Sequence, residues 1–203
     1  MSDYEEIKKH LQKYFFDKGV TLKIEETLKE TSYNEMADRY LYSGSRNLSV
    51  ISMDNIAKDG YRVIKSALGK PVNTVDAFLV DNNNDWYLIE FKDCKISSKK
   101  DNIEKKGMAN FLMLLDIFND EDSIKFEGSK NFFEFARKKL VYILVCSQDK
   151  DPYSYEQIRN CDNLGEKYRP DCLLKFKDYF FKDAYAYTED YFENRFVRKF
   201  MYE

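Results

Sequence analysis

The sequence predicts an α/β domain in which a mixed β-sheet is covered by helices on both faces. Residues 74–94 contain two apolar, β-rich runs around the turn-forming segment 81–85, a pattern typical of a β-hairpin. A long amphipathic helix is predicted next, over about 101–118, and residues 140–146 form a continuous apolar run typical of a buried central strand. A hairpin, a crossover helix and a further buried strand together indicate a three-layer core.

Length and composition are those of a globular protein. The 203 residues suffice for a single domain over 1–203, and the chain is 43% apolar and 34% charged. The net charge of −3 argues against a general, charge-driven association with nucleic acid or membrane. The 33 Lys and Arg residues still leave room for a local basic groove.

Two helices are predicted within about the first 41 residues. Apolar residues at helical spacing predict a first helix over 4–16, and a short extended piece is expected at 20–24. Ser32 is a candidate N-cap, because Glu35 three residues later completes a capping box. This second helix would run to about residue 41.

The long helix is expected to turn an apolar stripe toward the core. The stripe consists of Ile103, Met108, Phe111, Leu112, Leu115 and Phe118. The other predicted elements are a helix from Ser52 or Asp54 to about 68, a polar loop over 119–128, a short helix at 130–137, a helix at 154–162, a short helix from Asp171 to about 177, a strand over 179–187 and a last helix capped by Thr188.

Several chemistries are not expected from this sequence. The four cysteines form no CxxC pair and His10 is the only histidine, so neither a Cys/His zinc site nor a His-dependent catalytic triad is predicted. No signal peptide is expected, and the longest uncharged apolar run, near 107–115, is too short to span a bilayer. We therefore expect a cytoplasmic protein with no membrane partner.

Three charged residues are predicted to gather at the end of the hairpin away from its turn. A turn centred on Asn83 places Asp76 opposite Glu90, and Lys92 shares the face of Glu90 because side chains alternate along a strand. In an otherwise apolar hairpin these charges need partners or a metal. One interpretation is a partly buried salt bridge; the other is a site for Mg²⁺ or Mn²⁺ that acts on a phosphodiester.

The pattern Asp76, hairpin turn, Glu90-Phe91-Lys92 resembles the core motif of the PD-(D/E)XK nuclease superfamily. The resemblance covers about residues 74–118 and implies a restriction-endonuclease-like fold with additional N- and C-terminal helices. It further implies that Asp76, Glu90 and the backbone carbonyl of Phe91 bind Mg²⁺, with Mn²⁺ as a substitute, and that Lys92 is the catalytic lysine. The motif is short, so the resemblance depends on its context, namely the hairpin turn, the apolar strands and the long helix that follows.

The resemblance also directs attention to accessory residues. Many members supply a glutamate from a helix upstream of the hairpin, and Glu35 is the candidate here, although a capping role explains it equally well. The helix after the motif lacks the glutamine of some branches, and Lys105 or Lys106 is a candidate replacement that reaches the phosphate. A lysine-rich rim at Lys95, Lys99 and Lys100 is either a solvated charge run or a surface for nucleic acid.

Two functional hypotheses remain open at this point. The first is a Mg²⁺-dependent endonuclease that hydrolyses phosphodiester bonds, with DNA favoured over RNA as substrate. The second is a catalytically inactive, nuclease-like scaffold that binds a protein, as an inhibitor or immunity protein does. The chain's acidity favours the second hypothesis and the intact charged trio favours the first; a homodimer or another protein partner is compatible with either.

Overall fold

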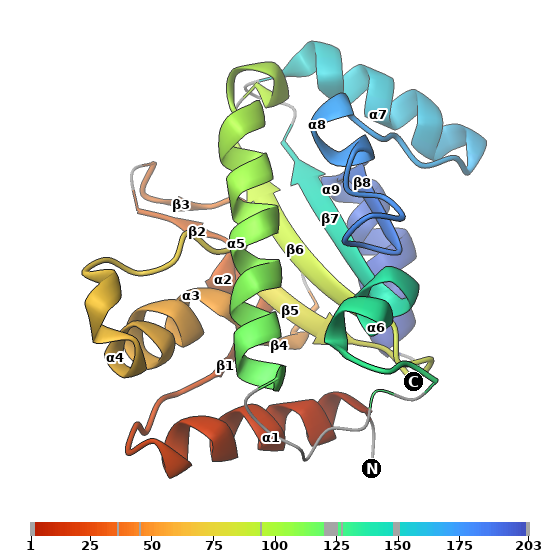
Figure 1. Ribbon diagram of the computed structural model, residues 1–203. Helices are drawn as coiled ribbons and strands as arrows, with labels where there is room; N and C mark the ends of the chain where they lie inside the picture. Colours follow the sequence, from red (N-terminus) through yellow and green to blue (C-terminus); the bar gives the residue numbers. More distant parts are fainter. Residues whose placement is uncertain are drawn as a thin grey trace.

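A mixed six-stranded sheet with helices on both faces forms the protein, as the computed structural model shows (Figure 1). The α/β class and the mixed central sheet predicted from the sequence are therefore confirmed. The structure describes residues 3–35, 37–44, 46–93, 95–119, 126, 128–147 and 151–201.

The sheet combines an antiparallel half with a parallel half. In spatial order its strands are β1 (Glu25–Thr27), β4 (Ser49–Ser52), β5 (Ala77–Val80), β6 (Trp86–Lys92), β7 (Leu140–Cys146) and β8 (Asp183–Thr188). The pairs from β1 to β6 are antiparallel, whereas β6, β7 and β8 run parallel. Every residue of β7 is buried, as expected for a central parallel strand covered on both faces.

Two apolar cores lie on opposite sides of this sheet. On one side pack α1 (Asp3–Asp17), α5 (Lys100–Asn119), α6 (Phe132–Lys139), α7 (Pro152–Leu164), α8 (Asp171–Leu174) and the segment formed by α3 (Met53–Asn55), η1 (Ile56–Tyr61), α4 (Arg62–Ile64) and η2 (Ser66–Leu68). On the other side lie α2 (Leu28–Thr31) and a C-terminal segment formed by α9 (Glu189–Tyr191), η4 (Phe192–Phe196) and η5 (Val197–Met201). None of the described helices is both long enough and apolar enough to cross a membrane.

The hairpin predicted over 74–94 is present, and its two faces are apolar as expected. Phe78, Val80, Trp86 and Leu88 belong to the core under α5, and Ala77, Leu79, Ile89 and Phe91 belong to the core under the C-terminal segment. Val75 packs in the first core, although its two-residue spacing from Ala77 would place it on the second face of a regular strand. It precedes β5, so the alternation of a regular strand does not yet apply to it.

The prediction of a helix starting at Ser32 is wrong. The S/T-x-x-E pattern occurs twice in succession, and the earlier copy makes the capping box: Thr27 caps α2, and its backbone N–H donates to Glu30 Oε2 at 2.7 Å. Ser32 ends that short helix. The following residues form a small hairpin of β2 (Tyr33–Asn34) and β3 (Arg39–Tyr40), which places Glu35 in the turn.

The outer strands β1 and β4 were missed. The extended piece expected at 20–24 lies just before β1, which starts at Glu25. Both strands are short, and β1 contains two glutamates and no apolar residue, so neither carries the alternation by which strands are recognised. The helix predicted to start at Ser52 or Asp54 is confirmed, because Ser52 accepts a hydrogen bond from the Asn55 backbone N–H.

The long helix is confirmed as α5, but part of its predicted core face is wrong. Met108 and Leu112 are 44% and 56% exposed, whereas Met113, Leu114 and Ile117 are buried. Apolar residues occupy more than one side of this helix, so spacing alone did not fix which side meets the sheet.

The remaining elements differ from prediction mainly in their boundaries. The helices expected at 130–137, 154–162 and 171–177 are α6, α7 and the shorter α8. The strand expected from 179 begins only at Asp183, after a turn in which Asp178 has a φ of 60°. Most of the loop predicted at 119–128 lies outside the described residues, as does Cys94. The last helix begins as predicted, with Thr188 accepting from the Tyr191 backbone N–H.

Candidate active site

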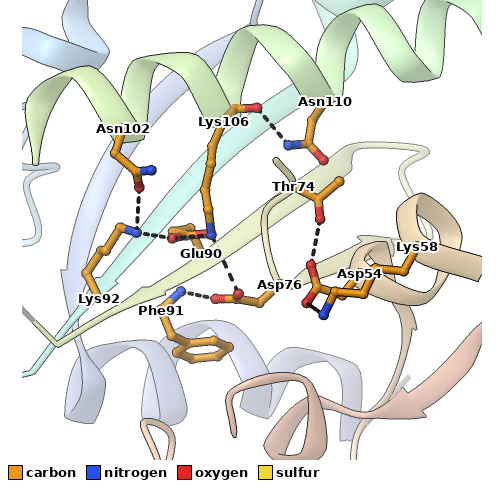
Figure 2. A network of polar contacts seen from close by, with 10 residues as sticks. All are labelled: Asp54, Lys58, Thr74, Asp76, Glu90, Phe91, Lys92, Asn102, Lys106 and Asn110. Atoms are coloured by element: carbon orange, nitrogen blue, oxygen red, sulfur yellow. Dashed lines mark hydrogen bonds and ion pairs between the residues drawn. The ribbon is translucent and has the colours of Figure 1, made fainter. Parts of the chain in front are cut away.

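The two carboxylates of the hairpin lie side by side at the predicted end. The pairs Ala77↔Ile89 and Phe78↔Leu88 define the register, and one further step places Asp76 opposite Glu90. Regular pairing stops there. The backbone N–H of Phe91 donates to Asp76 Oδ2 at 2.6 Å, which fixes the Asp76 side chain at the end of β5 (Figure 2). Glu90 is almost completely buried, with 1% of its surface exposed.

Two lysines converge on Glu90 from different elements (Figure 2). Lys92 comes from the same strand, forms an ion pair with Glu90 Oε1 and donates to Asn102 Oδ1 of α5 at 3.1 Å. Lys106 comes from α5 and donates to both oxygens of Glu90, at 2.8 and 2.7 Å. Its Nζ also lies 3.9 Å from Asp76 Oδ1. The predicted trio is therefore a quartet of two carboxylates and two ammonium groups.

One face of α5 supplies the polar groups that complete this quartet. Asn102, Lys106 and Asn110 follow each other at intervals of four residues and so lie on one side of the helix. Asn110 is fully buried and donates from Nδ2 to the backbone carbonyl of Lys106 at 2.7 Å. The sequence carried this spacing, but only the packing of α5 against the sheet shows which of its sides faces the carboxylates.

Burial and mutual repulsion control the charges at the site. Burial raises the pKa of Asp76 well above its usual value of 3.8, and the neighbouring charge of Glu90 raises it further; Lys106, the Phe91 N–H and Lys92 offset this only in part. Burial lowers the pKa of Lys106, but the carboxylates of Glu90 and Asp76 outweigh it, so the net shift is upward. The carboxylate pair thus favours a cation between its members, and Lys106 supplies one.

The donor set fits a hard divalent cation. Asp76 and Glu90 offer carboxylate oxygens, which Mg²⁺ and Mn²⁺ prefer. In a strand the N–H and C=O of one residue point to the same side, so the carbonyl of Phe91 faces Asp76, as its N–H does. Within the described part of the chain, no group of three or more Asp, Glu, His or Cys side chains converges as a metal site. Two carboxylates and a backbone carbonyl would bind the cation, and water would complete its shell.

A third acidic side chain approaches from the helix upstream of the hairpin. Asp54 accepts from Thr74 Oγ1 at 2.7 Å and pairs with Lys58 at 2.8 Å (Figure 2). Its charge also contributes to the raised pKa of Lys106, after those of Glu90 and Asp76. In the described part of the chain, Asp54 is thus an acidic side chain on the segment before the hairpin whose charge acts on Lys106.

Glu35 is exposed in the turn of the β2–β3 hairpin. The pKa of Lys58 is raised first by its hydrogen bond to Asp54 and then by the charges of Asp54, Glu35 and Asp59. The charge of Glu35 therefore reaches Lys58, but the expectation that Glu35 belongs to a helix is wrong.

The predicted lysine rim surrounds the amino end of α5. Lys99, Lys100 and Lys105 are exposed and line a surface pocket of about 430 Å³ that also contains Asn102, the partner of Lys92. Lys95 and Lys100 line a second pocket of about 570 Å³. The structure therefore separates the lysine pair of the sequence: Lys106 points into the site and Lys105 belongs to the rim.

Comparisons with protein-family models, with curated proteins and with solved structures found no significant match to this chain. Function is therefore inferred from the geometry of the site.

Proposed function

We propose that this protein is a metal-dependent nuclease that hydrolyses phosphodiester bonds at the Asp76–Glu90 pair. The observation that carries the proposal is the convergence of two carboxylates and two lysines at one end of the central hairpin. The sheet, with an antiparallel half joined to a parallel half across β6 and a long helix between β6 and β7, supports a restriction-endonuclease-like arrangement.

Metal binding and catalysis would fall to different residues of the site. Asp76, Glu90 and the carbonyl of Phe91 would hold Mg²⁺, or Mn²⁺ in its place. When bound, such an ion polarises a phosphate and lowers the pKa of a bound water. Lys92, oriented by Asn102, would position the attacking water or stabilise the charge that develops on the phosphate.

Lys106 would change partners during this process. Its ammonium group now neutralises Glu90, at the place that a cation would take. A divalent ion would release it from Glu90, and the flexible side chain could then reach the phosphate. Before binding, the two carboxylates and two ammonium groups cancel in charge; with a divalent ion the site becomes positive, which suits an anionic substrate.

The proposal is tested by incubating the purified chain with supercoiled plasmid, linear duplex DNA, single-stranded DNA and RNA in Mg²⁺, Mn²⁺ or EDTA. We expect cleavage in Mg²⁺ or Mn²⁺ and none in EDTA, with DNA the favoured substrate. Asp76→Asn, Glu90→Gln and Lys92→Ala should each lower the rate at least 100-fold, because the first two remove a carboxylate that would hold the ion and the third removes the ammonium group at the water and phosphate. Lys13→Ala, which removes an exposed lysine of α1 that belongs neither to the site nor to the rim, serves as the matched control for loss of a lysine.

A second candidate function is a nuclease-like scaffold without catalysis that binds a protein. The placement of Lys106 favours it, since a permanent ammonium group between the carboxylates would replace a metal. The net charge of −3 agrees with it as well. This candidate predicts no cleavage of any of the four substrates and no heat of Mn²⁺ binding in calorimetry, and that pair of results would exclude the nuclease.

A further inference from the structure

Two exposed tyrosines face each other on the small β2–β3 hairpin. Tyr33 and Tyr40 are direct partners across the two strands, their ring centroids lie 5.1 Å apart, and they are 44% and 48% exposed. Lys29 Nζ lies 5.3 Å from the centre of the Tyr40 ring. An aromatic pair with a cation beside it is therefore open to solvent.

Several contacts hold these rings in place, although strands of two residues contribute little stability by themselves. The Tyr33 hydroxyl donates to Asp38 Oδ1 at 2.5 Å, across a turn in which Asp38 has a φ of 49°. At the base, Ser32 is buried and its Oγ accepts from the Tyr42 backbone N–H at 3.1 Å. The rings are thus preorganised, which lowers the entropy lost when a ligand packs on them.

An ion pair ties the hairpin to the candidate active site. Arg39 Nη2 lies 2.7 Å from Asp93 Oδ2, and Asp93 directly follows Lys92 at the end of β6. The Asp93 side chain is 5% exposed and the Arg39 side chain 42%, so the ion pair lies at the surface with its carboxylate shielded from water. In Figure 1 the hairpin projects beside α5, on the same side of the molecule as α4. The aromatic pair therefore belongs to a hairpin that is anchored beside the end of β6, next to Lys92.

From this arrangement we infer that the Tyr33–Tyr40 pair is a stacking platform for unpaired bases of the nucleic acid that enters the site. The inference rests on the proposed nuclease function and narrows its substrate to strands with a single-stranded segment, such as an end, a flap or a loop. Bases in a duplex are stacked on each other and offer no free face, whereas an unpaired base can stack on tyrosine.

The charge of the chain makes stacking important. With a net charge of −3, and with Glu35, Asp54 and Asp59 all close enough to Lys58 to act on its charge, general attraction for phosphate is weak. Base stacking depends little on sequence, because every base offers a π-face. It supplies binding where the electrostatic contribution is small.

The test measures binding of a fluorescein-labelled single-stranded oligonucleotide, and of the same sequence as a blunt duplex, by anisotropy in EDTA. Tyr33→Ala and Tyr40→Ala should each weaken single-strand binding about 10-fold, the scale of one lost base–aromatic stack, and leave duplex binding unchanged. Tyr33→Phe and Tyr40→Phe should bind within about 2-fold of the wild type, because the ring remains. Tyr179→Ala, which removes another exposed tyrosine, is the matched control.

Three results would overturn the inference. One is unchanged single-strand binding in both alanine variants, and another is a loss no larger than that of Tyr179→Ala. The third is a change in oligomeric state by light scattering, which would make the rings a protein interface. Because binding is measured without metal, the two proposals can fail separately. Single-strand binding that depends on Tyr33, together with no cleavage, would refute only the nuclease. Cleavage together with single-strand binding that does not depend on Tyr33 would refute only the stacking platform.

Discussion

At the scale of single residues, Lys106 determines the charge state of the candidate site. It contacts both oxygens of Glu90 and lies close to Asp76, so it takes the position in which a cation between two carboxylates is most stable. A metal must compete with this lysine for the same oxygens. The competition couples metal binding to the release of an ammonium group next to the phosphate site.

Lys106→Met should therefore tighten binding of Mn²⁺ in the absence of nucleic acid. We expect an increase in affinity on the order of 10-fold, less than Coulomb's law gives for fixed charges, because the lysine can swing away in the wild type. The same variant should cleave more slowly, since the phosphate loses a contact. Calorimetry with Lys105→Met as control measures the first effect, and equal affinities for the two variants would contradict it.

The residues of the site were predictable to the extent that they depend on local geometry. Strand alternation and the centre of the turn were enough to bring Asp76, Glu90 and Lys92 together. The contribution of Lys106 depends on which side of α5 faces the sheet. Apolar residues lie on several sides of that helix, so their spacing did not predict this side. For the same reason Met108 and Leu112 were wrongly assigned to the core.

At the scale of elements, β8 shows how the parallel edge of the sheet is protected. Its first residue, Asp183, accepts from Arg169 Nε at 2.9 Å and from Lys167 Nζ at 3.1 Å, and the Ala186 N–H donates to Tyr168 O at 2.8 Å. The segment before α8 thus bonds to the edge strand at Ala186 and at Asp183, and it covers part of an edge that would otherwise be open to another chain.

The ion pairs of Asp183 predict a loss of stability in acid. Burial alone would raise the pKa of Asp183, but its hydrogen bonds from Arg169 and Lys167 lower it to about 2 from 3.8. A lowered pKa stabilises the fold above pH 4, and this contribution is lost as the pH falls from about 4 to about 2. At about 1.4 kcal/mol per pKa unit, the loss is about 2 kcal/mol.

Urea unfolding between pH 2.5 and pH 6 measures this effect. Asp183→Asn should be less stable than the wild type at pH 6, and the difference should shrink toward pH 2.5. Glu156→Gln removes an exposed ion pair with Arg159 and serves as control. A difference between wild type and Asp183→Asn that is constant across this range would contradict the assigned pKa.

At the scale of the whole molecule, the sequence predicted the centre of the fold better than its periphery. The hairpin, α5 and β7 have long, strongly patterned segments, and all three were found where expected. The β2–β3 hairpin was predicted as a helix because two overlapping capping patterns compete locally, and tertiary contacts such as the Arg39–Asp93 pair favour the alternative. The short outer strands β1 and β4 owe their conformation to their neighbours in the sheet and carry no pattern of their own.

The central claim is that Asp76 and Glu90 form a cation site in which a metal competes with the ammonium group of Lys106. The most direct measurement is a crystal of the protein soaked in Mn²⁺, with diffraction data collected for anomalous scattering. We predict one strong anomalous peak between the two carboxylates, next to the carbonyl of Phe91, with the Lys106 side chain displaced from Glu90. A map at saturating Mn²⁺ with no peak there, and with Lys106 Nζ still on both oxygens of Glu90, would contradict the account.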